Sequence, residues 1–376
     1  MNRHTNVNPI SVCFVSPKAY GLFDPSVQTN FGGAEVDLYM LATELAKDPA
    51  FSVSFITADY GQPAELVLEN VRLLKSLDFN KNPLDGAFRI WRALKKADAQ
   101  LCLIKTASAG VPLVSAFCRL RHRRFLYRTA HRRECDGTYR KDHPILGRLF
   151  NRSLRRATCV FAQNQEDQDS LLQTTGVHSV VIPNGHRINP PAAVNRNSIL
   201  WVGRSAGFKH PQRLLELAGR FPNERFVMIC RPATGDRKYG QFQKEAAAVQ
   251  NLEFHTNADF FKMDAYFDAA KVLVNTSDAE GFPNTFIQAA KAGAAILTWK
   301  VNPDQFLTQY QCGLACGGSM DKLTEGLAFL LENRRYIEIG QNGVNYCREH
   351  HDISKLAELY KEHFRRITAA GAARPE

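Results

Sequence analysis

The sequence of 376 residues lacks long apolar runs, and its longest are only strand-sized. A membrane-spanning helix needs roughly 18 consecutive apolar residues, so no such span is expected. The first ten residues, MNRHTNVNPI, have no apolar core of the kind that a secretory signal requires. Nine cysteines are scattered without a C-x-x-C pair. We therefore expect a cytoplasmic protein with reduced thiols that is not exported.

A metal-binding cluster is also missing from the sequence. Cys312 and Cys316 are the closest pair of cysteines, but no His or Cys partner follows at the spacing of a zinc site. We expect no metal and no resident cofactor.

Length and composition favour two α/β domains. A chain of 376 residues is too long for one ordinary hydrophobic core. Its 44% hydrophobic and 23% charged residues are ordinary for a globular protein. Two series of alternating strands and helices are separated by a Pro- and Asn-rich segment after Pro183. We predict an N-terminal Rossmann-like domain over residues 1–190, a second over 191–350, and a C-terminal helix with a frayed tail over 351–376.

The segment Lys271–Trp299 is the best candidate for a functional site. Its apolar start predicts a buried strand, and a loop with the acid Glu280 follows. Pro283 suits the first turn of the next helix. In an open α/β sheet such a loop lies at the carboxyl edge, where ligands bind. The N–H groups of Asn284 and Thr285 at the helix start favour an anion there.

A second loop supplies positive charge. Arg204 and Lys209 follow the first strand of the second domain, and a guanidinium with an ammonium can neutralise a diphosphate. Glu280 and Gln288 bracket the start of the helix and can accept hydrogen bonds from sugar hydroxyls. Each feature alone also fits a solvated surface. Together they predict a site for a nucleotide diphosphate joined to a polyol.

Two candidates lie in the first domain. Gly32 and Gly33 open a helix after the first strand, where backbone amides can approach a phosphate, although a simple tight turn explains them equally well. His131 follows the end of a strand, and histidines in such places are often structural.

Positive charge is concentrated between Arg119 and Arg156. This segment holds thirteen Lys and Arg but three acids, so it carries +10 of the net charge of +11. Such a patch attracts nucleic acid, anionic lipid or a phosphorylated substrate, and a solvated basic face is the alternative. The amphipathic helix predicted at Ile145–Arg156 can lie on a membrane, but we favour packing of its apolar face on the sheet.

Three motifs resemble those of the retaining GT-B glycosyltransferases of family GT4: GGAE at Gly32–Glu35, VGR-x4-K at Val202–Lys209 and EGFPNTFIQA at Glu280–Ala289. The resemblance covers nearly the whole chain in order. It implies two doubly wound Rossmann-like domains facing across a cleft, with C-terminal helices that pack back toward the first domain. It also implies transfer of a sugar from a nucleotide-diphosphate sugar (EC 2.4), generally without a metal.

The same resemblance implies roles for individual residues. Arg204 and Lys209 would hold the donor diphosphate, Glu280 the hydroxyls of the donor sugar, and Asn284 and Thr285 its phosphates. Gly32 and Gly33 would close on the phosphate from the first domain, and His131 would lie near the reacting sugar and acceptor. The catalytic residues implied by the resemblance are His131, Glu280, Arg204 and Lys209. The donor-binding residues implied by it are Gly32, Gly33, Arg204, Lys209, Glu280, Asn284, Thr285 and Gln288.

Gln288 departs from the family pattern, which has a second acid at that position for the ribose hydroxyls. An amide offers one acceptor oxygen and no charge, so nucleotide affinity is expected to be weaker by roughly 1–3 kcal/mol.

The basic segment lies on the acceptor side by resemblance. It predicts a saccharide or lipid-linked saccharide acceptor and peripheral attachment to the inner membrane face. For a sugar transferase of this kind we expect no nucleic-acid partner. A surface-polysaccharide or glycoconjugate pathway is the expected setting. Two other functions stay open: a nucleotide-sugar 2-epimerase on the same fold, and a non-catalytic relative that binds a polyanion or membrane.

Overall fold

The computed structural model describes residues 8–27, 29, 31–189, 195–233, 235–256 and 262–372. Contacts between Cα atoms divide the chain into two compact units. The first holds residues 1–187 with 353–376, and the second holds 188–352. Among the described residues, no helix is long and apolar enough to cross a membrane.

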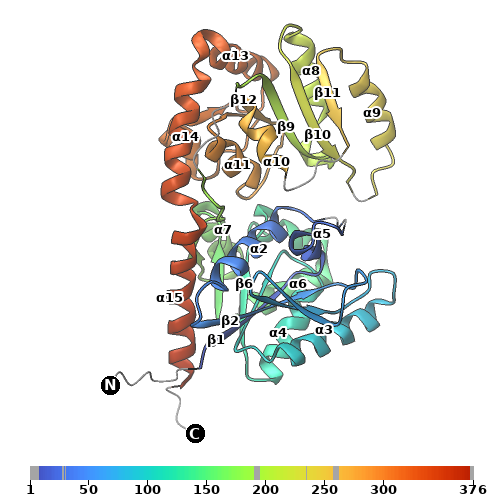
Figure 1. The fold of residues 1–376 in the computed structure, drawn as a ribbon, viewed down its shortest axis with the longest axis vertical. Helices are drawn as coiled ribbons and strands as arrows, with labels where there is room; N and C mark the ends of the chain where they lie inside the picture. The colour runs from blue at the N-terminus through green and yellow to red at the C-terminus, as the bar shows by residue number, and fades with distance from the viewer. Residues whose placement is uncertain are drawn as a thin grey trace. The chain divides into compact units, whose positions relative to one another are not determined.

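The first unit is built on a sheet of eight strands with the order β3-β4-β2-β1-β5-β6-β7-β8 (Figure 1). All its neighbouring strands are parallel except β3, which pairs antiparallel with β4. The strands are β1 (Ile10–Val15), β2 (Phe51–Thr57), β3 (Glu65–Leu68), β4 (Val71–Lys75), β5 (Leu101–Lys105), β6 (Arg124–Arg128), β7 (Cys159–Ala162) and β8 (Val180–Val181).

Helices cover both faces of this sheet. The strand residues Cys13, Cys102 and Tyr127 point into one core shared with α3, α4, α6 and α7. On the other face, Phe14 stacks on Phe55, and α2 and α15 pack there. The helices are α1 (Tyr20–Phe23), α2 (Gly33–Leu45), α3 (Pro83–Ala97), α4 (Gly110–Leu120), α5 (Thr138–Asp142), α6 (Pro144–Leu154), α7 (Gln165–Thr175) and α15 (Ile353–Ala372).

The C-terminal helix α15 belongs to the first unit, as Figure 1 shows beside β1 and β2. Its Phe364 ring lies 6.5 Å from that of Phe51, and its Tyr360 ring lies 4.9 Å from that of Phe161. Helix α14 (Tyr336–His350), in contrast, packs on α11 in the second unit. Only the last helix therefore returns to the first domain. It remains helical through Ala372, and residues 373–376 of the predicted tail lie outside the described residues.

A buried polar network lies where β5 and β6 end. Asp37 of α2 accepts hydrogen bonds from Lys105 Nζ at 2.7 Å and Arg128 Nε at 2.5 Å. Asn184 Oδ1 accepts from both cations, at 3.1 and 2.8 Å. Burial alone would raise the pKa of Asp37, but the charges of Arg128 and Lys105 outweigh it and lower that pKa to about 2. Because these groups satisfy one another, the cluster fixes the segment that leaves this unit.

The predicted apolar face of α6 is only half covered. Phe150 and Leu154 are buried, and the Phe150 ring meets that of Tyr127 edge to face at 5.3 Å. Ile145 and Leu149 are 77% and 46% exposed. The predicted packing of the apolar face on the sheet therefore holds for Phe150 and Leu154, which join the core shared with the strands, and not for Ile145 and Leu149.

The second unit contains a parallel sheet with the order β11-β10-β9-β12-β13-β14. Helices α10, α11 and α14 share a core with one face, and α8 and α13 share a core with the other. The remaining elements are β9 (Ser198–Arg204), α8 (Gln212–Arg220), β10 (Phe226–Arg231), α9 (Tyr239–Ala247), β11 (Leu252–His255), α10 (Met263–Asp268), β12 (Ala270–Asn275), α11 (Asn284–Ala292), β13 (Ala295–Thr298), α12 (Phe306–Gln309), β14 (Gly313–Ala315) and α13 (Met320–Leu331).

Both units are thus doubly wound Rossmann-like folds, as predicted. In the second unit the strand order reverses direction between β9 and β12. The crevice at the carboxyl ends of two such strands is where open α/β sheets bind ligands.

Candidate functional site

A short ion pair joins two of the predicted residues at this reversal point. Lys209 Nζ lies 2.5 Å from Glu280 Oε1, and the two side chains are 16% and 12% exposed. Lys209 ends the short 3-10 helix Gly207–Lys209 after β9, and Glu280 lies in the loop after β12. Because β9 and β12 are adjacent and parallel, their loops meet at the same edge of the sheet.

The Glu280 carboxylate is held by more than the lysine. Its Oε1 also accepts a hydrogen bond from Ser277 Oγ at 2.7 Å and from Asn275 Nδ2 at 3.4 Å. Three donors on one oxygen fix the orientation of the carboxylate. A carboxylate held in this way is suited to accept hydrogen bonds from a sugar in one defined pose.

Further hydrogen bonds join the loop after β9 to the loop after β12. Thr276 Oγ1 donates to the carbonyl oxygen of Lys209 at 2.6 Å and accepts from Nε1 of the buried Trp201 at 2.8 Å. The N–H of Asp278 donates to the carbonyl oxygen of Phe208 at 2.9 Å. These bonds set the backbone on both sides of Lys209. Thr276, Trp201 and Asp278 were not predicted as part of the site, because their roles depend on contacts across the fold.

Asp278 forms a second, outer link between the loops. His210 Nε2 lies 2.5 Å from Asp278 Oδ2, and Arg213 donates to Asp278 Oδ1 at 3.1 Å and to the Thr276 carbonyl at 2.7 Å. Partial burial raises the pKa of Asp278, but the bonds and charges of Arg213 and His210 outweigh it and lower that pKa. The Arg213 guanidinium also lies 4.0 Å from the centre of the Trp299 ring. Asp278 is therefore ionised and holds His210, the neighbour of Lys209, in place.

Helix α11 starts at this edge, as predicted. Phe282 anchors the preceding loop in the core, with its ring 5.0 Å from Phe306 and 4.8 Å from His351. The helix ends at Gly293, whose φ of +78° suits glycine. Its half-buried face carries three predicted residues, Asn284, Thr285 and Gln288.

These three residues occupy one side of the helix because Gln288 follows Asn284 by four positions and Thr285 by three. The opposite side, with Phe286, Ile287, Ala289 and Ala290, is buried in the core. Amides of the first turn lack intrahelical acceptors, so they and the helix dipole favour an anion at this end. The helix thus presents polar side chains and an anion-binding terminus together.

Arg204 shares the edge but not the ion pair. It is the last residue of β9 and lies beside Arg231, the last residue of β10, in the parallel ladder. Its side chain is exposed and forms no salt bridge with a described residue. The expectation that Arg204 and Lys209 act together on one diphosphate stays a prediction.

The sequence carries no readable code for recognition of the base, for which we consider loops near Arg231 or Asn257. Arg231 is half-buried, and burial lowers its pKa. Asn257 lies outside the described residues.

In the first unit, Gly32 and Gly33 form the start of α2. Gly32 is the residue before the helix, and its N–H donates to Glu35 Oε2 at 2.7 Å. This bond is one half of a capping box, in which the side chain of the third helical residue satisfies the backbone N–H at the helix start. The glycine pair therefore has a structural role in addition to the predicted contact with a phosphate.

His131 lies just beyond β6, before the 3-10 helix Arg132–Glu134. Its Nδ1 accepts from the N–H of Arg133 at 3.2 Å. The fully buried Glu134 accepts hydrogen bonds from the N–H groups of Ala130 and Ala107, at 2.9 and 3.1 Å, and from Tyr127 Oη at 2.8 Å. Glu134 thus ties the loop that carries His131 to the loop after β5.

Glu134 gives no signal in the sequence, where it is one acid in a basic segment. Burial raises its pKa, although the donors around it and the charge of Lys105 act in the opposite direction.

Among the described residues, no three His, Cys, Asp or Glu side chains are grouped to hold a metal ion. The expectation that the protein needs no metal remains a prediction.

Two family models match the chain. The model described as glycosyltransferase family 4 matches residues 31–189, and the model described as glycosyl transferases group 1 matches residues 196–333. Together they cover most of both units. No curated protein matches the chain.

Solved structures share the fold at low sequence identity. Sucrose-phosphate synthase from Thermosynechococcus elongatus is 16% identical, with a TM-score of 0.79 over 96% of this chain and 100% of that one. Anabaena HepE in complex with UDP is 15% identical, with a TM-score of 0.70 over 95% and 100%. WaaG, a glycosyltransferase involved in lipopolysaccharide biosynthesis, is 15% identical, with a TM-score of 0.69 over 94% and 99%. These similarities show the two-domain fold of the chain.

Proposed function

We propose a specific reaction for this chain, which belongs to the group 1 glycosyltransferases of family 4 and has their two-domain GT-B fold. Membership makes it a sugar transferase. We infer that its donor is a nucleotide-diphosphate sugar and that the second unit binds it. The sugar passes with retention of the anomeric configuration to a saccharide or lipid-linked saccharide.

The observation that carries this proposal is the Lys209–Glu280 pair at the reversal point of the second sheet. The Lys209 ammonium has three donors, so it can keep its bond to Glu280 and also bind a diphosphate oxygen. Arg204 on the same edge adds a guanidinium, and the start of α11 adds the amides of Asn284 and Thr285. Positive charge and helix dipole thus converge where a diphosphate would lie.

We propose that two side chains recognise the rest of the donor by accepting hydrogen bonds, namely Glu280 and Gln288. Glu280 is oriented by Ser277, Asn275 and Lys209, and we assign it to the hydroxyls of the transferred sugar. Gln288 lies on the half-buried face of α11, in the second turn of the helix, and we assign it to the ribose. The neighbour HepE was solved with UDP and with UDP-glucose, which supports a donor of this chemical class.

In the proposed reaction, the bond from the anomeric carbon to the phosphate oxygen breaks. A bond to the acceptor oxygen forms on the same face of the sugar. The acceptor proton passes to the departing phosphate oxygen, so no separate base is required. Lys209, Arg204 and the helix amides stabilise the negative charge that develops on the leaving diphosphate. In the first unit, we assign His131 to the reacting sugar and the acceptor. We assign the Gly32–Gly33 turn to the phosphate.

We place the acceptor on the first unit because its segment Arg119–Arg156 carries most of the net charge. Part of this charge is neutralised locally, because Arg132 pairs with Glu166 and Arg133 with Asp142. Arg148 and Arg152 remain exposed on α6 beside the exposed Ile145 and Leu149. Basic and apolar side chains on one exposed helix support peripheral attachment to an anionic membrane and an acceptor in surface-polysaccharide or glycoconjugate synthesis.

The test is incubation of the full chain with a panel of nucleotide sugars and candidate acceptors. Release of a nucleoside diphosphate that depends on acceptor supports transfer, and NMR of the new glycosidic bond reports retention. Donor conversion to an epimer without acceptor would favour a 2-epimerase instead. Failure to bind any nucleotide in the panel would remove the proposal.

A further inference from the structure

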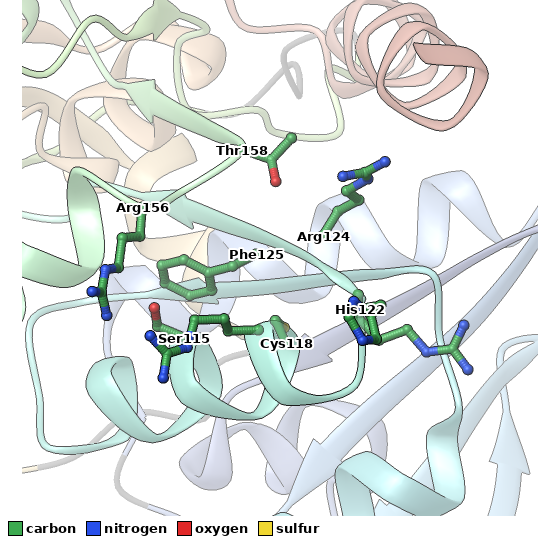
Figure 2. A pocket seen from close by; sticks show the side chains of 9 residues that line it. Ser115, Cys118, His122, Arg124, Phe125, Arg156 and Thr158 are labelled. Atoms are coloured by element: carbon green, nitrogen blue, oxygen red, sulfur yellow. The ribbon is translucent and has the colours of Figure 1, made fainter. Parts of the chain in front are cut away.

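A second charged site lies in the first unit, at the opposite edge of the sheet from His131. It is a pocket of about 620 Å³ between the end of α4, the start of β6 and the connection from α6 to β7. Figure 2 shows Arg156 on one side, Arg124 and His122 on the other, and Phe125, Ser115 and Cys118 between them. The lining residues are Ser115, Cys118, Arg119, His122, Arg123, Arg124, Phe125, Arg156 and Thr158.

The lining of this pocket carries positive charge without a balancing acid, since it contains four arginines and no Asp or Glu. Arg123 pairs outward with Asp98, a residue that is not part of the lining. The other three, Arg119, Arg124 and Arg156, form no salt bridge within the described part of the chain. The nearby charges of Arg152 and Arg119, with some desolvation, lower the pKa of Arg156. Like charges held this close favour the arrival of an anion.

The pocket has a fixed frame. Phe125 and Cys118 are buried at 3% and 1% exposure and form its floor. The N–H of Arg124 donates to the Gln100 carbonyl at 2.9 Å, and that of Thr158 to the Phe125 carbonyl at 2.8 Å. The hydroxyls of Ser115 and Thr158 add neutral donors among the guanidinium groups. The sheet therefore fixes the backbone of Arg124, whereas Arg119 is carried by α4 and Arg156 by the connection from α6 to β7.

We propose that this pocket binds a phosphate-bearing ligand, as a phosphomonoester or a diphosphate, at a site separate from the donor site. A carboxylate has two oxygens and is satisfied by one guanidinium, whereas a phosphate can accept from several arginines at once. The volume falls within the roughly 300–1,000 Å³ typical of small-ligand pockets, so an ester group can accompany the phosphate. Strand β6 separates Arg124 from the edge that carries His131 by about 13 Å, at about 3.3 Å per residue. A ligand bound beside Arg124 therefore lies at the edge of the sheet remote from His131.

The first arm of the test uses inorganic pyrophosphate and the full chain. Arginine side chains are modified with phenylglyoxal with and without pyrophosphate, and each site is quantified by peptide mass mapping. Because the readout is specific to each residue, binding of pyrophosphate at Arg204 is scored separately. We expect protection of Arg119, Arg124 and Arg156, with Arg121 and Arg148 as exposed controls that stay reactive. The proposal would be overturned if pyrophosphate left the modification of the pocket arginines unchanged, as it does for the controls, and if the vesicle experiment described next showed no effect of the pocket variant.

The second arm distinguishes a lipid headgroup from a soluble phosphate. Vesicles of neutral lipid with phosphatidic acid are sedimented with the protein at near-physiological salt, where the Debye length is about 8 Å. The variant Arg119→Gln/Arg156→Gln is compared with Arg92→Gln/Lys95→Gln, which removes the same charge from two exposed positions of α3, outside the pocket and outside the segment Arg119–Arg156. A loss of about tenfold in vesicle affinity confined to the pocket variant identifies a lipid headgroup. Protection by pyrophosphate without such a difference identifies a soluble ligand.

Discussion

Lys209 and Glu280 are 71 positions apart in the chain, yet Nζ of the one lies 2.5 Å from Oε1 of the other. The pair forms because β9 and β12 are neighbours at the point where the order of the second sheet reverses. Each residue lies in the loop that leaves its strand, and Thr276 and Asp278 hold the two loops against each other. The fold thus places a cation for phosphate beside a carboxylate for hydroxyls.

The variant Glu280→Gln tests the carboxylate. It keeps the shape of the side chain but removes the charge opposite Lys209 and weakens the hydrogen bonds to sugar hydroxyls. A hydrogen bond to a charged group contributes about 1.5–3 kcal/mol, so we expect kcat/KM for the donor to fall about 10- to 100-fold. The matched control is Glu253→Gln, which loses an exposed pair with Arg225 in the same unit. An equal fall in both variants would argue against a specific role for Glu280.

Asp278 is predicted to be a positioning residue. In Asp278→Asn the ionic contacts to Arg213 and His210 are lost, and the backbone around Lys209 is freed to move. We expect a higher KM for the donor with a smaller change in kcat, because binding geometry is affected more than chemistry. Asp321→Asn is the control, since Asp321 forms an exposed pair with Arg220. A merely structural role would instead lower the melting temperature and leave the donor KM of the folded protein unchanged.

Replacement of Gln288 by glutamate is predicted to increase the affinity for nucleoside diphosphate. If the residue binds the ribose, Gln288→Glu restores a charged acceptor with two oxygens and raises the affinity for nucleoside diphosphate. The gain expected is about tenfold, or about 1.4 kcal/mol, measured by isothermal titration. Substitution of the exposed Gln241 in α9 by Glu controls for added negative charge. An unchanged or lower affinity in Gln288→Glu would mean that the amide has a role of its own.

The buried cluster around Asp37 predicts sensitivity to acid. The pKa of Asp37 is lowered to about 2 from an unfolded value near 3.8, so the unfolded chain takes up this proton first as the pH falls. The stabilisation is fully present above pH 4 and is lost between about pH 4 and pH 2. It amounts to about 2 kcal/mol.

This acid sensitivity is measured as the free energy of unfolding by urea across that range. Titration of the Asp37 carboxyl by 13C NMR supplies a readout that needs no variant. An Asp37 carboxyl that titrates near pH 4 in the folded protein would contradict the assignment.

Local signals in the sequence were sufficient for most of the fold. The sequence pattern predicts strands at Ile10–Val15 and Leu101–Lys105 and a helix at Pro83–Ala97, and the structure has all three with these bounds. Apolar runs mark these strands, and the helix has a local start signal, since Asn82 accepts from the N–H of Leu84 and Pro83 follows. The edge strand β3 was missed because it is short and partly exposed, and its antiparallel pairing has no local signal.

The site was predictable only in part. Motifs placed Lys209 and Glu280 at the carboxyl edge of the sheet, but their direct contact depends on which strands are neighbours. The Arg213–Asp278 link and the buried Glu134 arise from tertiary contacts, so neither gives a pattern along the chain. The exposure of Ile145 and Leu149 also depends on tertiary packing, since only Phe150 and Leu154 of the predicted apolar face join the core as fully buried residues.

The central claim is that Lys209 binds the donor diphosphate, and steady-state release of nucleoside diphosphate tests it most directly. The wild type is compared with Lys209→Ala and with Lys244→Ala, which removes an exposed lysine from α9. Loss of one preorganised donor to a developing charge costs about 10²- to 10³-fold in turnover, and we expect this loss in Lys209→Ala alone. Full turnover by Lys209→Ala would contradict the account.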